Sequence, residues 1–252
     1  MVIIVYRKWY SNKTVQYEIV NALKDKYLTV LSDEGLNIAY ISIRSVKDLN
    51  FYMDKYKLYN GKFNFYFTVN NYKWKNFFDI RFDLREKEYE YFRTGKTKGA
   101  KRSLIFKTHE ETLISRDMNF DFDAHGETDI LNTIAYKEIL LLSHYFNSKH
   151  YVFYVKMSGT GWHLTLPNYL ERNERAEEKS LFAEVMAKYD FRSLDKNVYN
   201  DFQVLKCPYT VDKKTGNVVL PVNTQDLITI KSYNFKEILR TTNLFGRGLK
   251  KW

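Results

Sequence analysis

Cysteine and histidine, the residues that most often hold structural metals, are scarce in this sequence. The chain contains one cysteine, Cys207, so a disulfide within the chain and a cysteine-rich zinc site are both excluded. The 5 histidines show neither the HxxxH nor the HExxH spacing of zinc-binding helices; they are His109, His125, His144, His150 and His163. The sequence therefore predicts no zinc.

Proline, glycine and long apolar runs are also scarce. With 3 prolines, 10 glycines and no Ser/Gly-rich segment, the sequence shows no clear linker between domains. The apolar run at its start, Val2–Tyr6, is too short for a signal peptide, and no segment is long and apolar enough to span a membrane. We therefore expect a soluble, intracellular protein without a membrane partner.

Apolar, aromatic and basic side chains are abundant. Of the 252 residues, 44% are hydrophobic and 17% aromatic, enough for a sizeable core in one domain or in two closely packed lobes. Lys and Arg number 40 against 30 Asp and Glu, which gives a formal net charge of +10. This excess favours a polyanionic partner, nucleic acid before membrane. The alternative is a Lys-rich background that serves only solubility.

The first lobe, over residues 1–115, is predicted to be an α/β unit. Strands are predicted at Val2–Tyr6, Tyr27–Leu31, Ile38–Ile43 and Lys62–Val69, and helices at Thr14–Lys26 and Val46–Tyr59. The segment Phe51–Phe67 interleaves Tyr and Phe with Lys, as surfaces that stack on bases do. We favour the plainer interpretation, an amphipathic helix followed by an aromatic strand. The Gly- and Lys-rich residues 93–99 lack the spacing of a P-loop.

The second lobe, over residues 116–235, is predicted to continue the alternation of strands and helices. A turn at 125–129 leads into a helix whose apolar side chains recur every three or four residues from Leu131 to Phe146. Strands are predicted at Tyr151–Met157, Trp162–Pro167, Phe202–Lys206 and Val218–Pro221, and a further helix at Arg172–Tyr189. Residues 236–252 read as a basic tail.

The stretch Met118–Asp123 alternates strictly between apolar and polar side chains. In a β-strand this pattern buries the apolar set and projects Asp121 and Asp123 from one face. Their Cα atoms are then roughly 7 Å apart, close enough for the two carboxylates to share a divalent cation. A strand whose outer face is simply acidic is the alternative.

A glycine-containing turn separates the next two strands. Residues 158–161 read Ser-Gly-Thr-Gly, and the glycines permit a tight backbone that brings main-chain N–H groups near phosphate oxygens. In the following strand Trp162 and Leu164 alternate with His163, which therefore points away from the apolar side. A Ser/Gly-rich hairpin with an exposed histidine is the alternative.

A third group of polar residues begins at Asp195, a further carboxylate. Lys206 and Lys214 follow as cations able to meet a triphosphate. Lys214 belongs to the segment Lys-Lys-Thr-Gly-Asn, which suits a plain turn between strands equally well.

In combination and in this order, the three segments resemble the three motifs of the archaeo-eukaryotic primase superfamily. The matching residues are Asp-Phe-Asp after an apolar strand, then Ser-Gly-x-Gly-x-His, then Leu-Asp-x-Asn-Val with Leu-Lys-x-Pro-Tyr-x-Val-x-x-Lys-Thr-Gly. The sequence is most similar to the catalytic small subunit of replicative DNA primase, over roughly residues 119–221. The resemblance implies an α+β, primase-type fold. In it an RRM-like mixed sheet, the catalytic module, packs against an N-terminal α/β unit, with the site in the cleft between them.

Residue by residue, the resemblance implies a two-metal site with a bound nucleotide. Asp121, Asp123 and Asp195 match the catalytic, metal-binding carboxylates for two Mg²⁺ or Mn²⁺ ions. A nucleotide-binding role is implied for a further set: Ser158, Gly159, His163, Lys206 and Lys214. No zinc is expected.

Two positions depart from the family pattern. Thr160 stands where the family often has a basic residue, and Asp212 stands where the replicative subunits have a histidine. Asp212 adds negative charge close to an expected triphosphate contact. The Cys/His zinc knob usual in the small subunits is absent as well. These departures indicate a minimal, divergent or mobile-element-type member.

The sequence-based hypothesis is a DNA primase or primase-polymerase, a template-directed nucleotidyltransferase that makes or extends RNA or DNA primers. Three clustered carboxylates suit two-metal catalysis, and the basic surplus suits a nucleic acid backbone. Expected partners are a single-stranded DNA template and primer, NTP and/or dNTP, and a large primase subunit or a helicase, in the cytoplasmic, nucleoid-associated replication machinery. One alternative is a primase-like subunit that binds nucleic acid without catalysis. The other is a glycosyltransferase whose Asp-x-Asp binds the metal of a sugar nucleotide.

Overall fold

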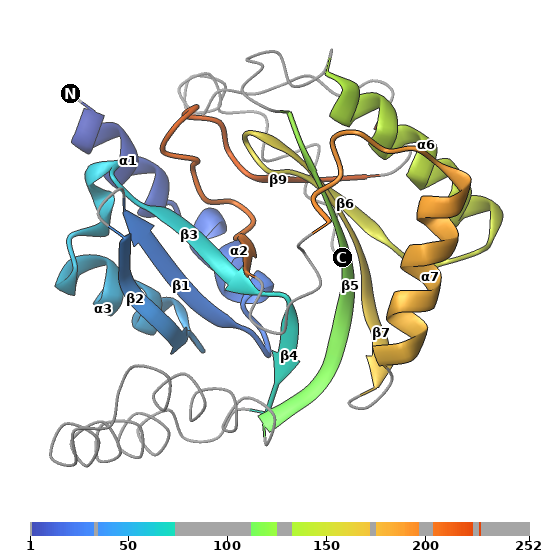
Figure 1. Cartoon of the computed structure of the whole chain (residues 1–252). Helices are drawn as coiled ribbons and strands as arrows, with labels where there is room; N and C mark the ends of the chain where they lie inside the picture. Colours follow the sequence, from blue (N-terminus) through green and yellow to red (C-terminus); the bar gives the residue numbers. More distant parts are fainter. Residues whose placement is uncertain are drawn as a thin grey trace, which may run out of the picture.

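Two β-sheets, each covered by helices on one face, form two lobes that lie side by side (Figure 1). The computed structural model describes residues 2–32, 35–73, 112–124, 133–171, 175–196, 204–223 and 227. The first sheet has the strand order β2-β1-β3-β8 and the second the order β4-β5-β7-β6-β9. The predicted α+β fold is confirmed. Within the described ranges every strand pair is antiparallel, so the expectation of a mixed sheet was wrong in this detail.

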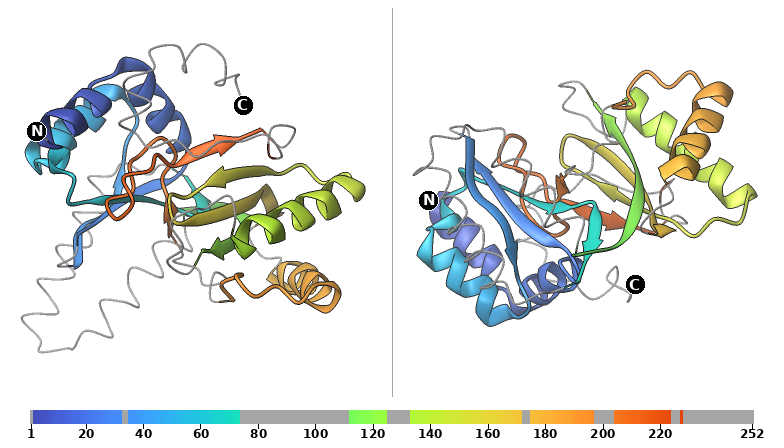
Figure 2. Two further views of the ribbon diagram at one scale, coloured as in Figure 1. Left: turned by 90° about the horizontal axis from the view of Figure 1, so that it is seen from above. Right: turned by 60° about the horizontal axis from the view of Figure 1, so that its bottom comes forward.

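The first lobe packs three helices on one face of its sheet, as Figure 2 shows. The helices are α1 (Val2–Tyr10), α2 (Lys13–Ala22) and α3 (Val46–Lys55), with a short 3₁₀ helix at Leu58–Asn60. The strands are β1 (Tyr27–Ser32), β2 (Gly35–Ser42), β3 (Asn64–Thr68) and β8 (Val204–Lys206). Asn12 caps α2 by accepting from the Thr14 N–H at 2.9 Å, and Ser45 caps α3 by accepting from the Asp48 N–H at 3.1 Å.

The strand predicted at Val2–Tyr6 is a helix in the structure, so that prediction was wrong. β-branched residues at its start favour a strand, but Tyr6, Trp9 and Tyr10 recur at helical spacing and are all buried in the core of the first lobe. The indole N–H of Trp9 donates to the carbonyl oxygen of Tyr209 at 3.0 Å. Contacts with distant residues therefore decide the conformation of this segment.

The second lobe places two helices over the apolar face of its sheet (Figure 1). The helices are α6 (Ile134–Ser148) and α7 (Arg175–Lys188). The strands are β4 (Asn70–Tyr72), β5 (Leu113–Asp123), β6 (Tyr154–Met157), β7 (Gly161–Glu171) and β9 (Leu220–Val222). The other predicted helices and strands are thus confirmed, with shifted ends. The segment 93–99, the turn at 125–129 and the tail at 236–252 lie outside the described residues.

The chain crosses between the two sheets more than once. It leaves the first sheet at β3 and enters the second at β4, and later β8 returns to pair with β3, with Lys206 opposite Tyr66. The part of the third motif that contains Leu205 and Lys206 therefore lies on the first lobe. The division at residues 1–115, 116–235 and 236–252 stays a prediction.

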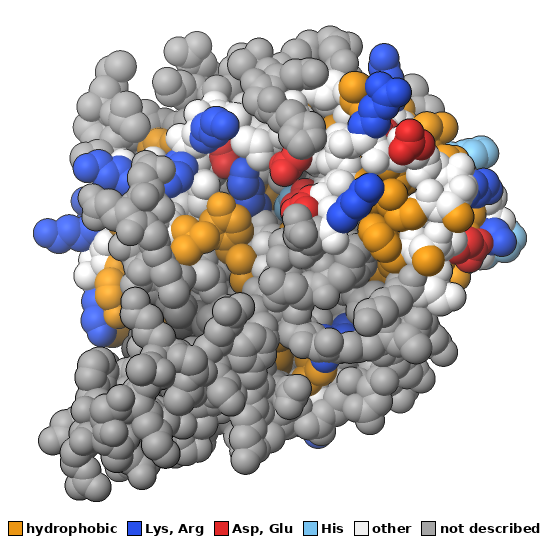
Figure 3. All heavy atoms as spheres, in the orientation of Figure 1, with side chains coloured by type: hydrophobic (Ala, Val, Ile, Leu, Met, Phe, Trp, Pro, Cys, Tyr) orange, Lys and Arg blue, Asp and Glu red, His pale blue; other side chains and the backbone are white. Residues whose placement is uncertain are grey.

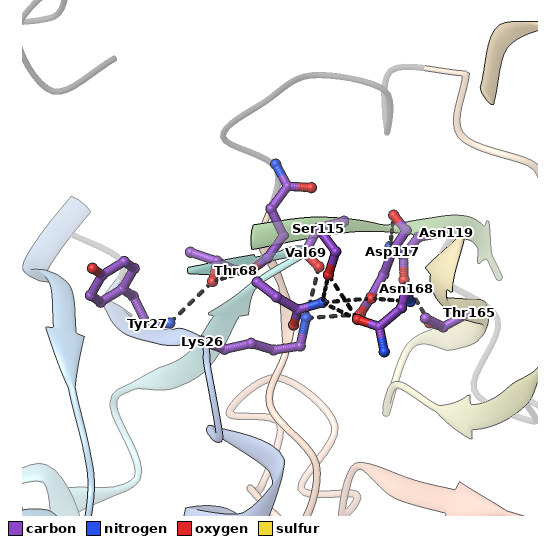
Figure 4. A network of polar contacts seen from close by, with 11 residues as sticks. Lys26, Tyr27, Thr68, Val69, Ser115, Asp117, Asn119, Thr165 and Asn168 are labelled. Atoms are coloured by element: carbon purple, nitrogen blue, oxygen red, sulfur yellow. Dashed lines mark hydrogen bonds and ion pairs between the residues drawn. The ribbon is translucent and has the colours of Figure 1, made fainter. Parts of the chain in front are cut away.

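A buried polar network joins the lobes (Figure 4). The ammonium group of Lys26 lies 2.8 Å from the Asp117 carboxylate and donates to the Val69 carbonyl at 2.7 Å. The other oxygen of Asp117 accepts from the Asn71 amide and from the Asn168 backbone N–H, both at 2.9 Å. Because each buried charge in this network has a partner, the network can hold β5 beside the first lobe at a low desolvation cost.

No helix in the described ranges combines the length and the apolar character that a membrane span requires.

Candidate active site

The alternating stretch forms the end of β5, as predicted. Met118, Phe120 and Phe122 are fully buried in the core of the second lobe. Asp121 and Asp123 lie on the opposite face. Asp117 shares that face and pairs with Lys26, so the face is turned toward the first lobe. The two carboxylates therefore lie where the lobes meet.

Asp195 lies directly beside Asp121 in the backbone. Its N–H donates to the Asp121 carbonyl at 2.8 Å, and the Asp123 N–H donates to the Ser193 carbonyl at 2.9 Å. Leu194 and Phe122 form an antiparallel bridge at the same place. The segment thus adds to the edge of β5 that faces away from β7, and it brings the third predicted carboxylate to the first two.

A buried glutamate on α6 holds this added segment in place. One carboxylate oxygen of Glu138 accepts from the Arg192 N–H at 2.7 Å, and the other accepts from the Ser193 N–H at 3.0 Å and from the Ser193 hydroxyl. Glu138 is 7% exposed. Charge-assisted hydrogen bonds of this kind are stronger than neutral ones, so Glu138 positions Asp195 from the far side of the sheet.

The three carboxylates offer an all-oxygen donor set, which suits Mg²⁺ or Mn²⁺. Asp121 has a side chain only 16% exposed, whereas Asp195 is half-buried and Asp123 exposed. Oδ1 of Asp121 accepts no well-aligned hydrogen bond from the described residues, which leaves lone pairs for an ion. In the described part of the chain, no three His, Cys, Asp or Glu side chains already converge as a formed metal site. The backbone brings the three aspartates close together, and their carboxylates must turn toward one another to bind the same ion.

Acidic and basic side chains meet on the face of the molecule shown in Figure 3. There a small group of acidic side chains lies near the middle, with lysine or arginine side chains on either side. This distribution is the one expected of a site that holds cations and polyanions together.

Both glycines of the β6–β7 turn are required by close approach. A Cβ at Gly161 would lie 2.1 Å from the Phe122 carbonyl oxygen, because β5 passes directly beside it. Gly159 has a φ of +88°, and a Cβ there would lie 2.6 Å from the Cβ of Asp212. The turn closes with the Ser158 N–H donating to the Gly161 carbonyl at 2.8 Å. The second motif is therefore wedged between the Asp-x-Asp strand and the third motif.

His163 lies opposite Asp121 on the neighbouring strand. Its Nε2 is 3.1 Å from Oδ1 of Asp121, a distance at which a protonated imidazole forms an ion pair, although the angle is poor for a hydrogen bond. Burial lowers the pKa of His163 and outweighs Asp121, which raises it. Burial raises the pKa of Asp121, but His163 and then Lys156 and Lys206 outweigh it, so the pKa of Asp121 is lowered. A neutral imidazole beside an ionised carboxylate is the arrangement that follows near neutral pH.

Lys206 reaches from the first lobe to the second motif. Its ammonium group lies 2.5 Å from Oδ2 of Asp212 and donates to the Thr160 hydroxyl at 2.9 Å. Thr160, a departure from the family pattern, therefore contacts a predicted nucleotide-binding lysine. Lys214 is exposed, and Ser158 is 2% exposed.

Asp212 organises the turn of the third motif. Its Oδ1 accepts from the Thr215 N–H at 2.8 Å, from the Thr215 hydroxyl at 3.0 Å and from the Lys214 N–H at 3.1 Å. Burial raises the pKa of Asp212, but Lys206 and Thr215 outweigh burial and lower it. Its negative charge is therefore compensated by the Lys206 ammonium group and by the N–H and hydroxyl donors of the turn. The sequence alone had suggested that Asp212 adds negative charge beside the triphosphate.

The sequence matches no known protein family and no curated protein. Among solved structures, the fold is similar to the polymerase domain of Mycobacterium tuberculosis Ligase D in complex with DNA. The TM-score is 0.58 at 13% identity, over 97% of this chain and 89% of that one. This likeness shows the fold.

Sequence reasoning missed two residues of the site neighbourhood. Glu138 lies in the predicted helix, where its only signal was an acidic residue in an apolar segment. Lys156, on β6, is fully buried, and it lies opposite His163 in the sheet. Its signal was the alternation itself, because Val155 and Met157 are apolar and Lys156 must share the face of His163.

Proposed function

We propose that this protein is a template-directed nucleotidyltransferase that makes or extends RNA or DNA primers on single-stranded DNA. The observation that carries the proposal is the convergence of three predicted motifs at one place between the lobes. Asp195 lies in backbone contact with Asp121, and the second motif lies between Asp123 and the Lys206–Asp212 pair. The fold shared with a polymerase domain in complex with DNA supports the proposal.

Each group in this arrangement has a chemical task. Asp121, Asp123 and Asp195 would hold two Mg²⁺ or Mn²⁺ ions. Such ions lower the pKa of an attacking 3′-hydroxyl and offset the charge of the phosphates. His163 and Lys206 lie on two sides of the glycine turn, where they bind and orient a triphosphate.

The Lys206 side chain is held in one position by its two partners, Asp212 and Thr160. An unrestrained lysine carries several rotatable bonds, and fixing them on binding a ligand costs conformational entropy. Asp212 and Thr160 hold the ammonium group in place before the nucleotide arrives. The bound nucleotide therefore meets a cation already oriented toward the turn.

The test is nucleotide incorporation on circular single-stranded DNA, with and without an annealed primer, with Mg²⁺ or Mn²⁺, and with NTPs or dNTPs. We expect incorporation by the wild-type protein, and a fall of at least about 100-fold in Asp123→Asn. Since Asp123 is exposed, its substitution should change the free energy of unfolding by less than about 1 kcal/mol.

The matched control is Asp190→Asn, an exposed carboxylate of the same lobe at the end of α7. This variant should retain wild-type incorporation. DNA binding without incorporation by the wild type would refute the proposal and favour a binding-only subunit. Equal incorporation by Asp123→Asn and wild type would remove the carboxylate cluster from the mechanism.

A further inference from the structure

Lys156 is an unexpected residue in the interior of the described part of the chain. It lies on β6 between Val155 and Met157, its exposed fraction is 0%, and it is among the largest fully buried side chains. Its Nζ has no hydrogen-bond partner within the described residues. Buried lysines are rare, and a buried amine without a partner is rarer still.

The surroundings of this amine offer one aromatic ring, but no hydrogen-bond acceptor among the described residues, to compensate a positive charge. Nζ lies 4.1 Å from the centre of the Phe67 ring of the first lobe, a cation–π contact. His163 is the cross-strand neighbour on β7, and Pro221 is the neighbour on β9. The other charged or titratable groups that act on it are Cys207, Lys26, Asp121 and Asp117. Asp117 already pairs with Lys26, and Asp121 lies two strands away, beyond His163.

Burial is accordingly the dominant influence on this amine. It lowers the pKa of Lys156 to about 7, and Cys207 and the two aspartates, which raise the pKa, do not outweigh it. The free protein therefore holds an amine that exchanges its proton near neutral pH. A residue of the same length without a charge, such as Met, would fill the space at lower cost. A buried amine of this kind would be stabilised as a cation by negative charge that arrives close by.

The predicted nucleotide site lies next to it. Ser158 follows two residues later in the chain, and His163 lies directly opposite. A triphosphate held by that turn would carry several negative charges into a region of low dielectric, where their field on a buried amine is strong.

We propose that Lys156 is a buried counter-charge for the phosphates of a bound nucleotide, and that it takes up one proton from solvent when the nucleotide binds. The proposal rests on the proposed function, because it places the phosphates at the turn of residues 158–161. No bond is made or broken besides the N–H bond that the proton forms. Nucleotide affinity then depends on pH through a residue that need not touch the ligand.

The test measures proton uptake by titration calorimetry in buffers of different ionisation enthalpy. The probes are dTTP with Ca²⁺, which avoids turnover, and tripolyphosphate alone. At pH 8 the terminal phosphate is already ionised, so uptake by the protein dominates. Wild type should take up most of one proton per dTTP. If binding raises the pKa of the amine by about two units, Lys156→Met should bind about tenfold more weakly at pH 8, without uptake.

Lys149→Met is the control, because Lys149 has a side chain 54% exposed at the end of α6, away from the turn. It should match wild type in both affinity and proton uptake. The affinity of wild type alone gives a second readout: its Kd for dTTP should rise by up to about tenfold per pH unit between pH 8 and 9.

The outcomes separate the two proposals. Binding with undiminished uptake in Lys156→Met would assign the proton to another group, such as His163, and would overturn the inference while leaving the proposed function intact. If wild type bound dTTP without taking up a proton, the inference would also be overturned and the proposed function would remain. Failure of wild type to bind either probe would overturn both.

Discussion

Replacement of Lys156 by Met should stabilise the folded protein, although most core substitutions destabilise. The side chain is fully buried without a hydrogen-bond partner in the described part of the chain. In the unfolded chain the amine has an ordinary pKa of 10.5, whereas burial lowers it to about 7 in the folded state. Folding at any pH below 10.5 therefore requires the amine either to lose its proton or to be buried as a charge.

The magnitude follows from the difference between the two pKa values. Each unit corresponds to about 1.4 kcal/mol, so the unfavourable contribution is about 5 kcal/mol at pH 6, about 3 kcal/mol at pH 8 and below about 1 kcal/mol at pH 10. The sign is that of a lysine with a depressed pKa: the unfolded state binds more protons, so stability rises with pH between 7 and 10.5. Lys156→Met removes this dependence.

The assay is urea denaturation of wild type and Lys156→Met at pH 6, 8 and 10, in EDTA and without nucleotide. The advantage of the variant should shrink by about 4 kcal/mol from pH 6 to pH 10, at an unchanged dependence on urea. A pH-independent difference of either sign would reflect packing alone. That result would refute the reasoning that the buried amine is deprotonated on folding.

Three further substitutions test the contacts of the site and of the lobe junction. Asp212→Ala should lower the affinity for dTTP by about tenfold and the free energy of unfolding by about 3 kcal/mol, because it leaves the partly buried Lys206 ammonium without its carboxylate. Gly161→Ala should abolish incorporation and lower stability by more than about 2 kcal/mol, because its Cβ would meet a β5 carbonyl at 2.1 Å. Lys26→Met should lower the free energy of unfolding by about 3 to 5 kcal/mol, because it leaves the buried Asp117 carboxylate without its cationic partner.

Calorimetry with Ca²⁺ and dTTP, the incorporation assay and urea denaturation measure these three effects. An Asp212→Ala variant with unchanged affinity would show that Lys206 needs no fixed partner. Wild-type stability in Gly161→Ala would mean that β5 and β7 can separate at this point. A stable Lys26→Met variant would show that water reaches the junction of the lobes.

Part of the site was predictable from local periodicity. The alternation of Met118–Asp123 required one face to be buried, and the structure places Phe120 and Phe122 at 0% exposure. The same rule placed His163 on the polar side. Cross-strand pairing then puts His163 opposite Asp121, which a strand pattern alone does not specify.

The role of Asp212 was not predictable in this way. Its sequence position suggested unmatched negative charge near a triphosphate, but the folded chain brings Lys206 within 2.5 Å of it. Whether a charge is exposed, paired or buried depends on neighbours from other strands, and the sequence does not specify them. Glu138 gives the same lesson, because its partners lie 54 and 55 residues away in the chain.

The sequence by itself determined which faces of its strands are apolar, where several helices begin, and where a turn requires glycine, because these properties depend on residues close together in the chain. The tertiary structure alone decided that Val2–Tyr10 is a helix, that β8 joins the first sheet, and that Lys156 is buried beside His163. These depend on which distant segments pack together. A single charge such as that of Lys156 acquires its pKa only from that packing.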